Sequence, residues 1–513
     1  MDLKPLKIPG IDSEFSTIDF ESHKINSKIL NQLISIVLIF LLLGDFAFSF
    51  IQYYNLPLFG DIDGGVLNNK IIQVIFDDPF GFTAVKTGEK HVNPNRFFSH
   101  YYLSIYFQRI PIWLQNFTDP ISSVYLASTL IKISVQFFFI FILAAFISKS
   151  NNPLNRNFLI SAIIITPLFQ VDGYWSRMGI NDKAIAYTFF YALPLVLLMF
   201  YFLPVFKKIL YHKKIRPINY ILLIPLTIAL PLSGPLVPAV TVLVTFLIVL
   251  KYLIQNNGKK FRQIFQSIPT EIYILLIPIT LWSLYSIFLG YFYDSNYQSE
   301  TIPLSERFLR LPAGILSQIF HSLGFPLLLF VIGLNIFLIK RNNFHEGEKH
   351  VQILIWIAIF ALLYILLLPF GGYRPYRPGI IRYDTFMPIT IALIYYFAGS
   401  TYYLLHHLKG NKRTRYLVGL IVVLLIYTFA DTDGIGENRC EWKAFEKMAI
   451  SNDSIVAIPK DCFIMSWENT FDYKLSENRA ELIYYWGITK DKKMFYNEHL
   501  EPDKNIHAPE EFH

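Results

Sequence analysis

The sequence predicts an all-α polytopic membrane protein with about eleven transmembrane helices. Of its 513 residues, 53% are hydrophobic and only 16% are charged, a composition typical of membrane proteins. Long apolar runs recur along the chain, and a helix that crosses the hydrocarbon core needs roughly 20 such residues. Lysine and arginine also gather in every second connection between the runs, as they do in loops that stay in the cytoplasm.

The predicted spans differ in length. Two of them are short enough to be re-entrant or distorted rather than complete crossings, namely 157–171 and 218–232. The full set is 29–53, 121–148, 157–171, 184–206, 218–232, 236–254, 270–292, 313–339, 351–370, 385–407 and 416–431.

The basic connections predict the orientation of the chain. With eleven spans, a leader of residues 1–28 is cytoplasmic, the transmembrane part covers 29–431, and a small mixed domain of residues 432–513 lies outside. The net charge of +7 therefore reflects topology, and we expect no nucleic-acid partner. We expect an integral multi-pass protein of a bacterial inner membrane, with its carboxy terminus in the periplasm or outside the cell.

The first outer loop, residues 54–120, opens on a pair of acidic residues in "YYNLPLFGDIDGG". Asp61 and Asp63 flank one isoleucine, and the apolar pattern of "VLNNKIIQVIFDD" then predicts an amphipathic helix on the membrane surface. Asp63 stands where the N-cap of that helix would stand, but capping explains one aspartate and not both. A second, aromatic interfacial helix is predicted within 93–114.

Four further polar residues of this loop are candidates for binding substrate. Asp77 and Asp78 precede Pro79, so they either end the first helix or form a second acidic site. Arg96 and His100 lie four residues apart, where they would contact an acceptor or a phosphate, or extend to the membrane interface.

A late outer loop, "GGYRPYRPGIIRYDTFMP" at residues 371–388, is unusually basic for its side of the membrane. Arg374, Arg377 and Arg382 therefore require a compensating negative charge. A phosphate suits them because the forked guanidinium matches phosphate oxygens. Anionic lipid headgroups or carboxylates of the first loop are the alternative partners.

The two cysteines of the chain, Cys440 and Cys462, both lie in the segment 432–513. In an oxidising compartment they are expected to form a disulfide within a small mixed domain, with two free thiols as the alternative. They lack companion ligands at the spacing of a metal site.

Taken together, the chain resembles the GT-C superfamily of membrane glycosyltransferases. The resemblance rests on the inside amino terminus, the first span, a large outer loop that opens with acids and holds two juxtamembrane helices, many further spans and a small outer carboxy-terminal domain. Arg382, Tyr383 and Pro388 are also similar to an Arg-Tyr and proline pattern in some GT-C enzymes. The resemblance implies a polyprenyl-phosphate-linked sugar as donor and a glycan, lipid or protein as acceptor, and the enzyme contacts membrane lipid.

The chemistry of such a transfer assigns roles to both loops. Arg374, Arg377 and Arg382 would stabilise the departing phosphate, and a carboxylate would remove the proton of the attacking hydroxyl, with inversion of the sugar carbon. Asp61 or Asp63 is expected to be this base. Both carboxylates are alternatively expected to hold a divalent cation, Mg²⁺ or Mn²⁺. Asp61 is preferred as catalyst because Asp63 has the capping role available.

Two other classes of protein remain open. A transporter or flippase for lipid or lipid-linked saccharide would also expose arginines to lipid phosphate, but paired broken helices are typical of that class, and the break at 231–235 has no partner. A non-catalytic scaffold would display the outer domain, which leaves the acidic loop unexplained.

Overall fold

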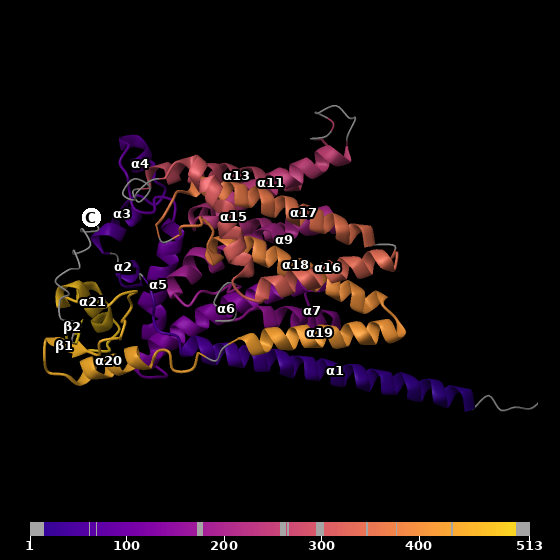
Figure 1. The fold of residues 1–513 in the computed structure, drawn as a ribbon, viewed down its shortest axis with the longest axis horizontal. Helices are drawn as coiled ribbons and strands as arrows, with labels where there is room; N and C mark the ends of the chain where they lie inside the picture. The colour runs from indigo at the N-terminus through magenta and orange to yellow at the C-terminus, as the bar shows by residue number, and fades with distance from the viewer. Residues whose placement is uncertain are drawn as a thin grey trace, which may run out of the picture.

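The structure is a computed structural model that describes residues 15–60, 62–67, 69–171, 178–256, 263, 266–293, 302–344, 347–375, 377–431 and 434–498. For residues 15–31 it describes the backbone alone. Figure 1 shows long helices running side by side, with the carboxy-terminal strands at one end of the bundle and the start of α1 projecting from the other. The protein is a helical, multi-pass membrane protein.

Within the described residues, nine helical segments are long and apolar enough to cross a membrane. Each of the nine overlaps a run predicted from the sequence. They are Gln32–Tyr54 of α1 (Phe15–Tyr54), α6 (Pro120–Ser148), Ile185–Tyr211 comprising α8 (Ile185–Tyr187), η2 (Thr188–Ala192) and α9 (Leu193–Tyr211), α11 (Leu236–Gln255), Thr270–Phe292 comprising α13 (Thr270–Leu289) and η4 (Gly290–Phe292), α16 (Gly324–Arg341), Gly347–Gly371 comprising α17 (Gly347–Leu367) and η5 (Leu368–Gly371), α18 (Tyr383–His407) and α19 (Gly410–Ala430).

The two short runs form shorter apolar helices, and the count of eleven crossings stays a prediction. They are α7 (Arg156–Ile165) with η1 (Thr166–Leu168), and α10 (Pro217–Ala229) with η3 (Leu230–Leu232). At 1.5 Å per residue, a helical stretch of this size covers roughly 20 Å, less than the roughly 30 Å hydrocarbon core. If neighbouring residues extend both short helices across the membrane, the chain crosses it eleven times, as the sequence predicts.

Local sequence fixes the ends of α6. Asp119 is its N-cap and accepts a hydrogen bond from the Ser122 N–H, and Pro120 occupies the first turn, where its missing N–H costs nothing. At the other end Lys149 adopts a left-handed conformation, with φ 58°. The ends of the helix therefore coincide with the ends of the apolar run in the sequence.

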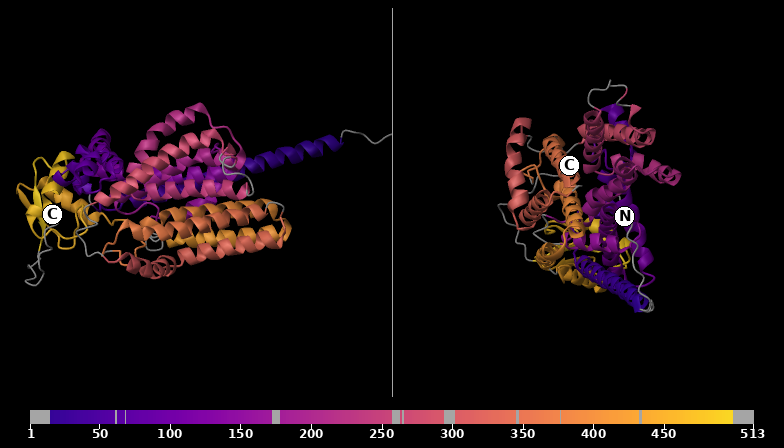
Figure 2. Two further views of the ribbon diagram at one scale, coloured as in Figure 1. Left: turned by 90° about the horizontal axis from the view of Figure 1, so that it is seen from above. Right: turned by 90° about the vertical axis from the view of Figure 1, so that its right-hand side faces the viewer.

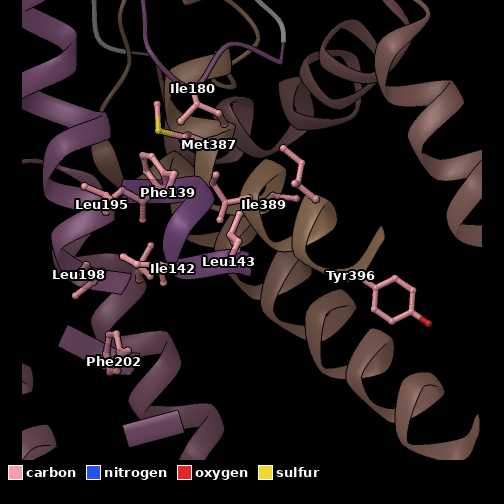
Figure 3. Close-up of a cluster of buried hydrophobic side chains, with 14 of the residues drawn as sticks. Phe139, Ile142, Leu143, Ile180, Leu195, Leu198, Phe202, Met387, Ile389 and Tyr396 are labelled. Carbon is pink, nitrogen blue, oxygen red and sulfur yellow. The ribbon is translucent and has the colours of Figure 1, made fainter. Parts of the chain in front are cut away.

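The membrane core is packed from α6, α7, α9 and α18. Their facing side chains form one continuous buried cluster, part of which is drawn in Figure 3. Phe139 and Leu143 of α6, Leu195 and Leu198 of α9, and Ile389 of α18 all belong to it. Close packing of such side chains holds α18 in place. The basic loop, residues 371–382, leads directly into the first turn of this helix.

The tail domain, residues 434–498, combines helices with a small sheet. It contains α20 (Arg439–Ile450), β1 (Ile455–Ile458), η6 (Tyr473–Ser476), α21 (Glu477–Tyr485) and β2 (Met494–Asn497). The two strands are parallel, with Ile455 opposite Met494. Cys440 and Cys462 are joined by a disulfide, with Cα atoms 5.7 Å apart. The domain lies beside the helices of the first loop (Figure 2, left).

The first loop holds more helices than expected. Instead of two, its described residues form α2 (Ile62–Val66), α3 (Lys70–Asp77), α4 (Phe82–Thr87) and α5 (Phe97–Leu114). The amphipathic helix starts at α3, and its N-cap is Asn69, whose side chain accepts from the Ile72 N–H. The expected capping by Asp63 is therefore wrong, because Asp63 lies inside the separate helix α2.

The predicted span 313–339 is also divided. Its first residues belong to α15 (Leu304–Phe320), and the span α16 begins only at Gly324. A Cβ atom added at Gly314 would lie 2.1 Å from the Gly379 carbonyl oxygen, so α15 packs directly on the basic loop. Its other face exposes Leu309 and Phe320, as in an amphipathic helix.

Candidate functional site

The basic loop, residues 371–382, ends at the first turn of α18, on the side of the bundle that carries the tail domain. Asp384, which is 1% exposed, lies between two of its arginines. The Arg382 guanidinium donates to the Asp384 carboxylate, and Arg377 Nη2 lies 3.8 Å from the same oxygen. Burial opposes the charge of Arg382, but the hydrogen bond to Asp384 outweighs it and raises the Arg382 pKa above its usual value.

Two tyrosines flank these arginines from the neighbouring span. Tyr187 ends α8, and Tyr191 lies four residues later in η2, a π-helical stretch of a kind often found at functional sites. The Arg382 guanidinium carbon lies 4.8 Å from the centre of the Tyr187 ring, and Arg377 Nη2 lies 3.4 Å from the Tyr191 hydroxyl. The tyrosines thus hold both cations by their ring faces and hydroxyls.

A third arginine of the basic loop meets the first loop over one aromatic ring. Arg374 and Arg96 lie 5.2 and 5.3 Å from the centre of the Tyr293 ring. The structure therefore brings Arg96 to the arginines of the basic loop.

Tyr383 has a positioning role. Its hydroxyl donates to the Asp182 carboxylate, whose other oxygen accepts from the Ala184 N–H at 2.7 Å. Behind this pair, the buried Lys132 donates to the Asp182 and Lys183 carbonyl oxygens at 2.9 and 2.6 Å. Burial raises the pKa of Asp182. These contacts hold the segment before α8 against the start of α18. They thereby keep the Tyr187 ring next to the Arg382 guanidinium.

Asp61 lies outside the described residues, but the segment before it is placed. Phe59 stacks on Trp467 of the tail domain, with ring centres 5.7 Å apart. Gly60 has φ +93°, and a Cβ atom there would lie 3.3 Å from Trp467 and 3.4 Å from Ala184. Only glycine adopts this conformation without strain and leaves room for the indole. Within the acidic segment, residues 59–63, Phe59 and Gly60 thus lie between the tail domain and the start of α8.

Asp63 faces the tail domain. It lies in the first turn of α2, and the Arg479 charge of the tail domain acts on it. Burial raises the pKa of Asp63, although the Gly64 N–H and Arg479 pull it down. A raised pKa makes a carboxylate a stronger base, and the Arg479 charge opposes this shift.

His100 adds no positive charge to the site. It is 4% exposed and its ring lies edge-on to Phe190, 4.7 Å between centres. Burial, with the nearby Arg96 charge, lowers the pKa of His100 to about 3. The imidazole is therefore neutral at physiological pH, and Arg96 remains the cationic candidate of this pair.

Asp77 and Asp78 are engaged at helix ends. Asp78 accepts hydrogen bonds from the N–H groups of Thr83 and Ala84, at 2.8 and 3.1 Å, and so caps α4. Asp77 accepts from the Gln73 side chain at 2.8 Å. Both carboxylates therefore lie at helix ends, which is one of the two alternatives that the sequence offered for them.

An apolar cavity of ≈ 370 Å³ lies among the spans. Pro388, one turn after Asp384 on α18, lines it near the basic loop, while Lys251 near the end of α11 lines it toward the opposite side of the membrane. The rest of its lining is almost wholly apolar, supplied by α6, α9, α11, α17 and α18. Its chemistry suits a hydrocarbon chain.

No group of three or more His, Cys, Asp and Glu side chains in the described residues could hold a metal ion. The two-carboxylate site of Asp61 and Asp63 lies partly outside those residues, so the base and metal roles of these aspartates both remain predictions.

Several residues of this cluster were not expected from the sequence. Tyr187 and Tyr191 have the four-residue spacing of one helix face, a signal hidden among the many aromatic residues of the spans. Asp384 follows the Arg382-Tyr383 pair directly, and only its burial reveals its role.

Comparison with known proteins finds no match. No family model fits the sequence, and neither a curated protein nor a solved structure matches the chain.

Proposed function

We propose that this protein is an integral membrane glycosyltransferase of the GT-C type. It moves a sugar from a polyprenyl-phosphate donor to a glycan, lipid or protein acceptor on the outer side of the membrane, in one inverting step. The observation that carries the proposal is the convergence of the basic loop and the acidic segment. Arg382 contacts Tyr187, Tyr187 contacts Trp467, and Trp467 stacks on Phe59, two residues before Asp61.

The arginines supply the binding site for the donor phosphate. Arg377 and Arg382 lie against the buried Asp384, and Arg374 shares the Tyr293 ring with Arg96. These guanidinium groups are gathered in a partly buried setting, and their forked N–H donors match the oxygens of a phosphate. As the bond to the sugar breaks, the same cations stabilise the charge that grows on the phosphate.

The cavity supplies the complementary site for the polyprenyl chain. It begins one helical turn from Asp384, at Pro388, and continues toward the other side of the membrane. A lipid with its phosphate on Arg382 would place its hydrocarbon in this space, because the almost wholly apolar lining matches a hydrocarbon chain.

Asp61 acts as the general base in this proposal. It removes the proton from the acceptor hydroxyl while that oxygen attacks the sugar carbon from the face opposite the phosphate. The oxygen–sugar bond forms as the sugar–phosphate bond breaks, and the bonding electrons leave on the phosphate. A divalent ion bound by Asp61 and Asp63 is the alternative means of activating the hydroxyl.

A transporter of lipid or lipid-linked saccharide is the second candidate, and the extent of the cavity favours it. The cavity lining reaches from Pro388 to Lys251, close to the far end of α11. A path of this length would suit a lipid that moves between leaflets.

One experiment separates the two. The protein is purified into nanodiscs with undecaprenyl-phosphate monosaccharides, and transfer of labelled sugar to cell-envelope acceptors is measured. The same donors are added to proteoliposomes to measure transbilayer movement. Sugar transfer without movement supports the glycosyltransferase. Movement without transfer supports the transporter.

A further inference from the structure

The tail domain presents an aromatic side chain to the arginine cluster, which consists of Arg96, Arg374, Arg377 and Arg382. Trp467 is 50% exposed, although it stacks on Phe59 with the two ring planes 4° apart. Its ring centre lies 6.2 Å from that of Tyr187. Because Tyr187 is the residue that Arg382 covers, Trp467 borders the same site as the basic loop.

The segment that carries Trp467 is fixed from several sides. The Cys440–Cys462 disulfide holds its start, and Asn497 Nδ2 donates to the Cys462 carbonyl oxygen at 2.9 Å. The Met465 N–H donates to the buried Glu441 carboxylate at 3.0 Å, and Arg479 Nη1 donates to the Ile464 carbonyl oxygen at 3.2 Å. An indole held on such a segment loses little conformational entropy when it binds a ligand.

The spacing between Trp467 and the arginines sets the size of the ligand group between them. The Arg382 guanidinium lies 4.8 Å from the centre of the Tyr187 ring, and that ring lies 6.2 Å from Trp467. The sum of these distances, about 11 Å, is the largest possible separation of Trp467 from Arg382. Arg382 and Trp467 are therefore close enough for one ligand to contact both, with its phosphate on the guanidinium and its sugar ring against the indole.

We infer that Trp467 is a sugar-binding residue, which stacks on the pyranose ring of the lipid-linked donor while the basic loop holds its phosphate. The apolar C–H face of a pyranose packs on an indole as other apolar groups do, and the partial positive charge of its hydrogens faces the ring electrons. The tail domain is thus a wall of the donor site. This inference rests on the proposed function.

The test compares donors with and without the sugar. Affinities of the full-length protein in nanodiscs are measured for undecaprenyl phosphate alone and for undecaprenyl phosphates that carry glucose, galactose, mannose or N-acetylglucosamine. At least one glycosylated donor is expected to bind the wild type more tightly than the sugar-free lipid. Trp467→Ala should weaken binding of that donor roughly three- to ten-fold, the range of a single aromatic contact. Sugar-free lipid should bind this variant as it binds the wild type.

Two variants control for folding. Trp467→Phe keeps an aromatic face and should recover most of the lost affinity. Trp113→Ala removes another exposed indole, which packs on Phe117 at 5.4 Å, and should bind every donor as the wild type does.

Three results overturn the inference while sugar transfer by the wild type persists, so that the proposed function survives. One is an equal loss of affinity for sugar-free and glycosylated lipid in Trp467→Ala. The second is no loss of affinity for either lipid. The third is a higher KM for the acceptor with unchanged affinity for the donor. If the wild type neither binds nor transfers any sugar of the panel, both the inference and the proposed function fail.

Discussion

Two charged centres lie on the tail-domain side of the molecule, and they differ in how their charges are balanced. Glu441 of α20 is 1% exposed, and its oxygens accept hydrogen bonds from the Leu58 N–H, the Met465 N–H and the Tyr125 hydroxyl, at 2.8, 3.0 and 2.8 Å. Every donor is neutral and belongs to the protein. The arginine cluster instead places two cations, Arg377 and Arg382, on one buried carboxylate, Asp384.

This difference separates a structural centre from a binding site. The buried Glu441 carboxylate accepts from three protein donors, and these bonds fasten the tail domain to the first loop and to α6. Each guanidinium carries several N–H donors in a fork, so the arginine cluster can also bind the oxygens of an anion. Substitutions in the two centres should accordingly affect different properties.

The largest effect is expected at the acidic segment that leads to the arginine cluster. Asp61→Asn should lower kcat for sugar transfer by about 10²- to 10⁴-fold, the usual contribution of a general base, with little change in donor affinity. The measurement is steady-state transfer by purified protein. Glu89→Gln, an exposed carboxylate of the same loop, is the control and should keep full activity. Wild-type kcat in Asp61→Asn would exclude the residue as catalyst.

Loss of a cation comes next. Arg382→Ala should weaken binding of undecaprenyl phosphate by about 10- to 100-fold, because a hydrogen bond to a charged group contributes roughly 1.5–3 kcal/mol. The matched control is Arg109→Ala, which removes an exposed arginine of α5 and should leave binding unchanged. Equal affinities of the two variants would show that the basic loop is not the phosphate site.

The structural centre should respond in stability. Glu441→Ala leaves the Leu58 and Met465 N–H groups without their acceptor, at a cost of about 1–3 kcal/mol for each buried group. We expect faster proteolysis of the tail domain and a lower Tm, while sugar-free undecaprenyl phosphate still binds. A large loss of lipid-phosphate affinity would mean that the two centres are not separate.

A smaller effect is expected from pH. Burial raises the pKa of Glu441 from 4.5 to about 7, against the hydrogen bonds that lower it. The folded protein therefore binds this proton more tightly than the unfolded chain. The contribution of Glu441 to stability is then largest below pH 4.5 and declines as pH rises to about 7. The difference in Tm between wild type and Glu441→Gln, followed over this range, isolates the effect from other carboxylates, and a difference independent of pH would refute it.

The same comparison explains what the sequence predicts and what it does not. Hydropathy and basic loops predict the spans because each is a local property of roughly 20 residues. The division of 313–339 was missed because apolar residues continue on both sides of His321 and Ser322, which lie between the end of α15 and the start of α16.

The sites follow the same rule. The arginines of the basic loop were recognisable because their charge is unusual for a loop that the sequence predicts to lie on the outer side. Asp384, Tyr187 and Trp467 were not, since their roles depend on contacts between α8, α18 and the tail domain, which no local pattern reports. Asn69 took the capping role expected of Asp63 because the chain forms the extra helix α2 before it.

The most direct test of the account is the position of a bound lipid phosphate. A structure of the protein in nanodiscs with undecaprenyl phosphate should show the phosphate oxygens within about 3 Å of the guanidinium nitrogens of Arg382 or Arg377. Its chain should enter the apolar cavity past Pro388. A phosphate bound away from the basic loop, for example beside Lys251 at the other end of the cavity, would contradict the account.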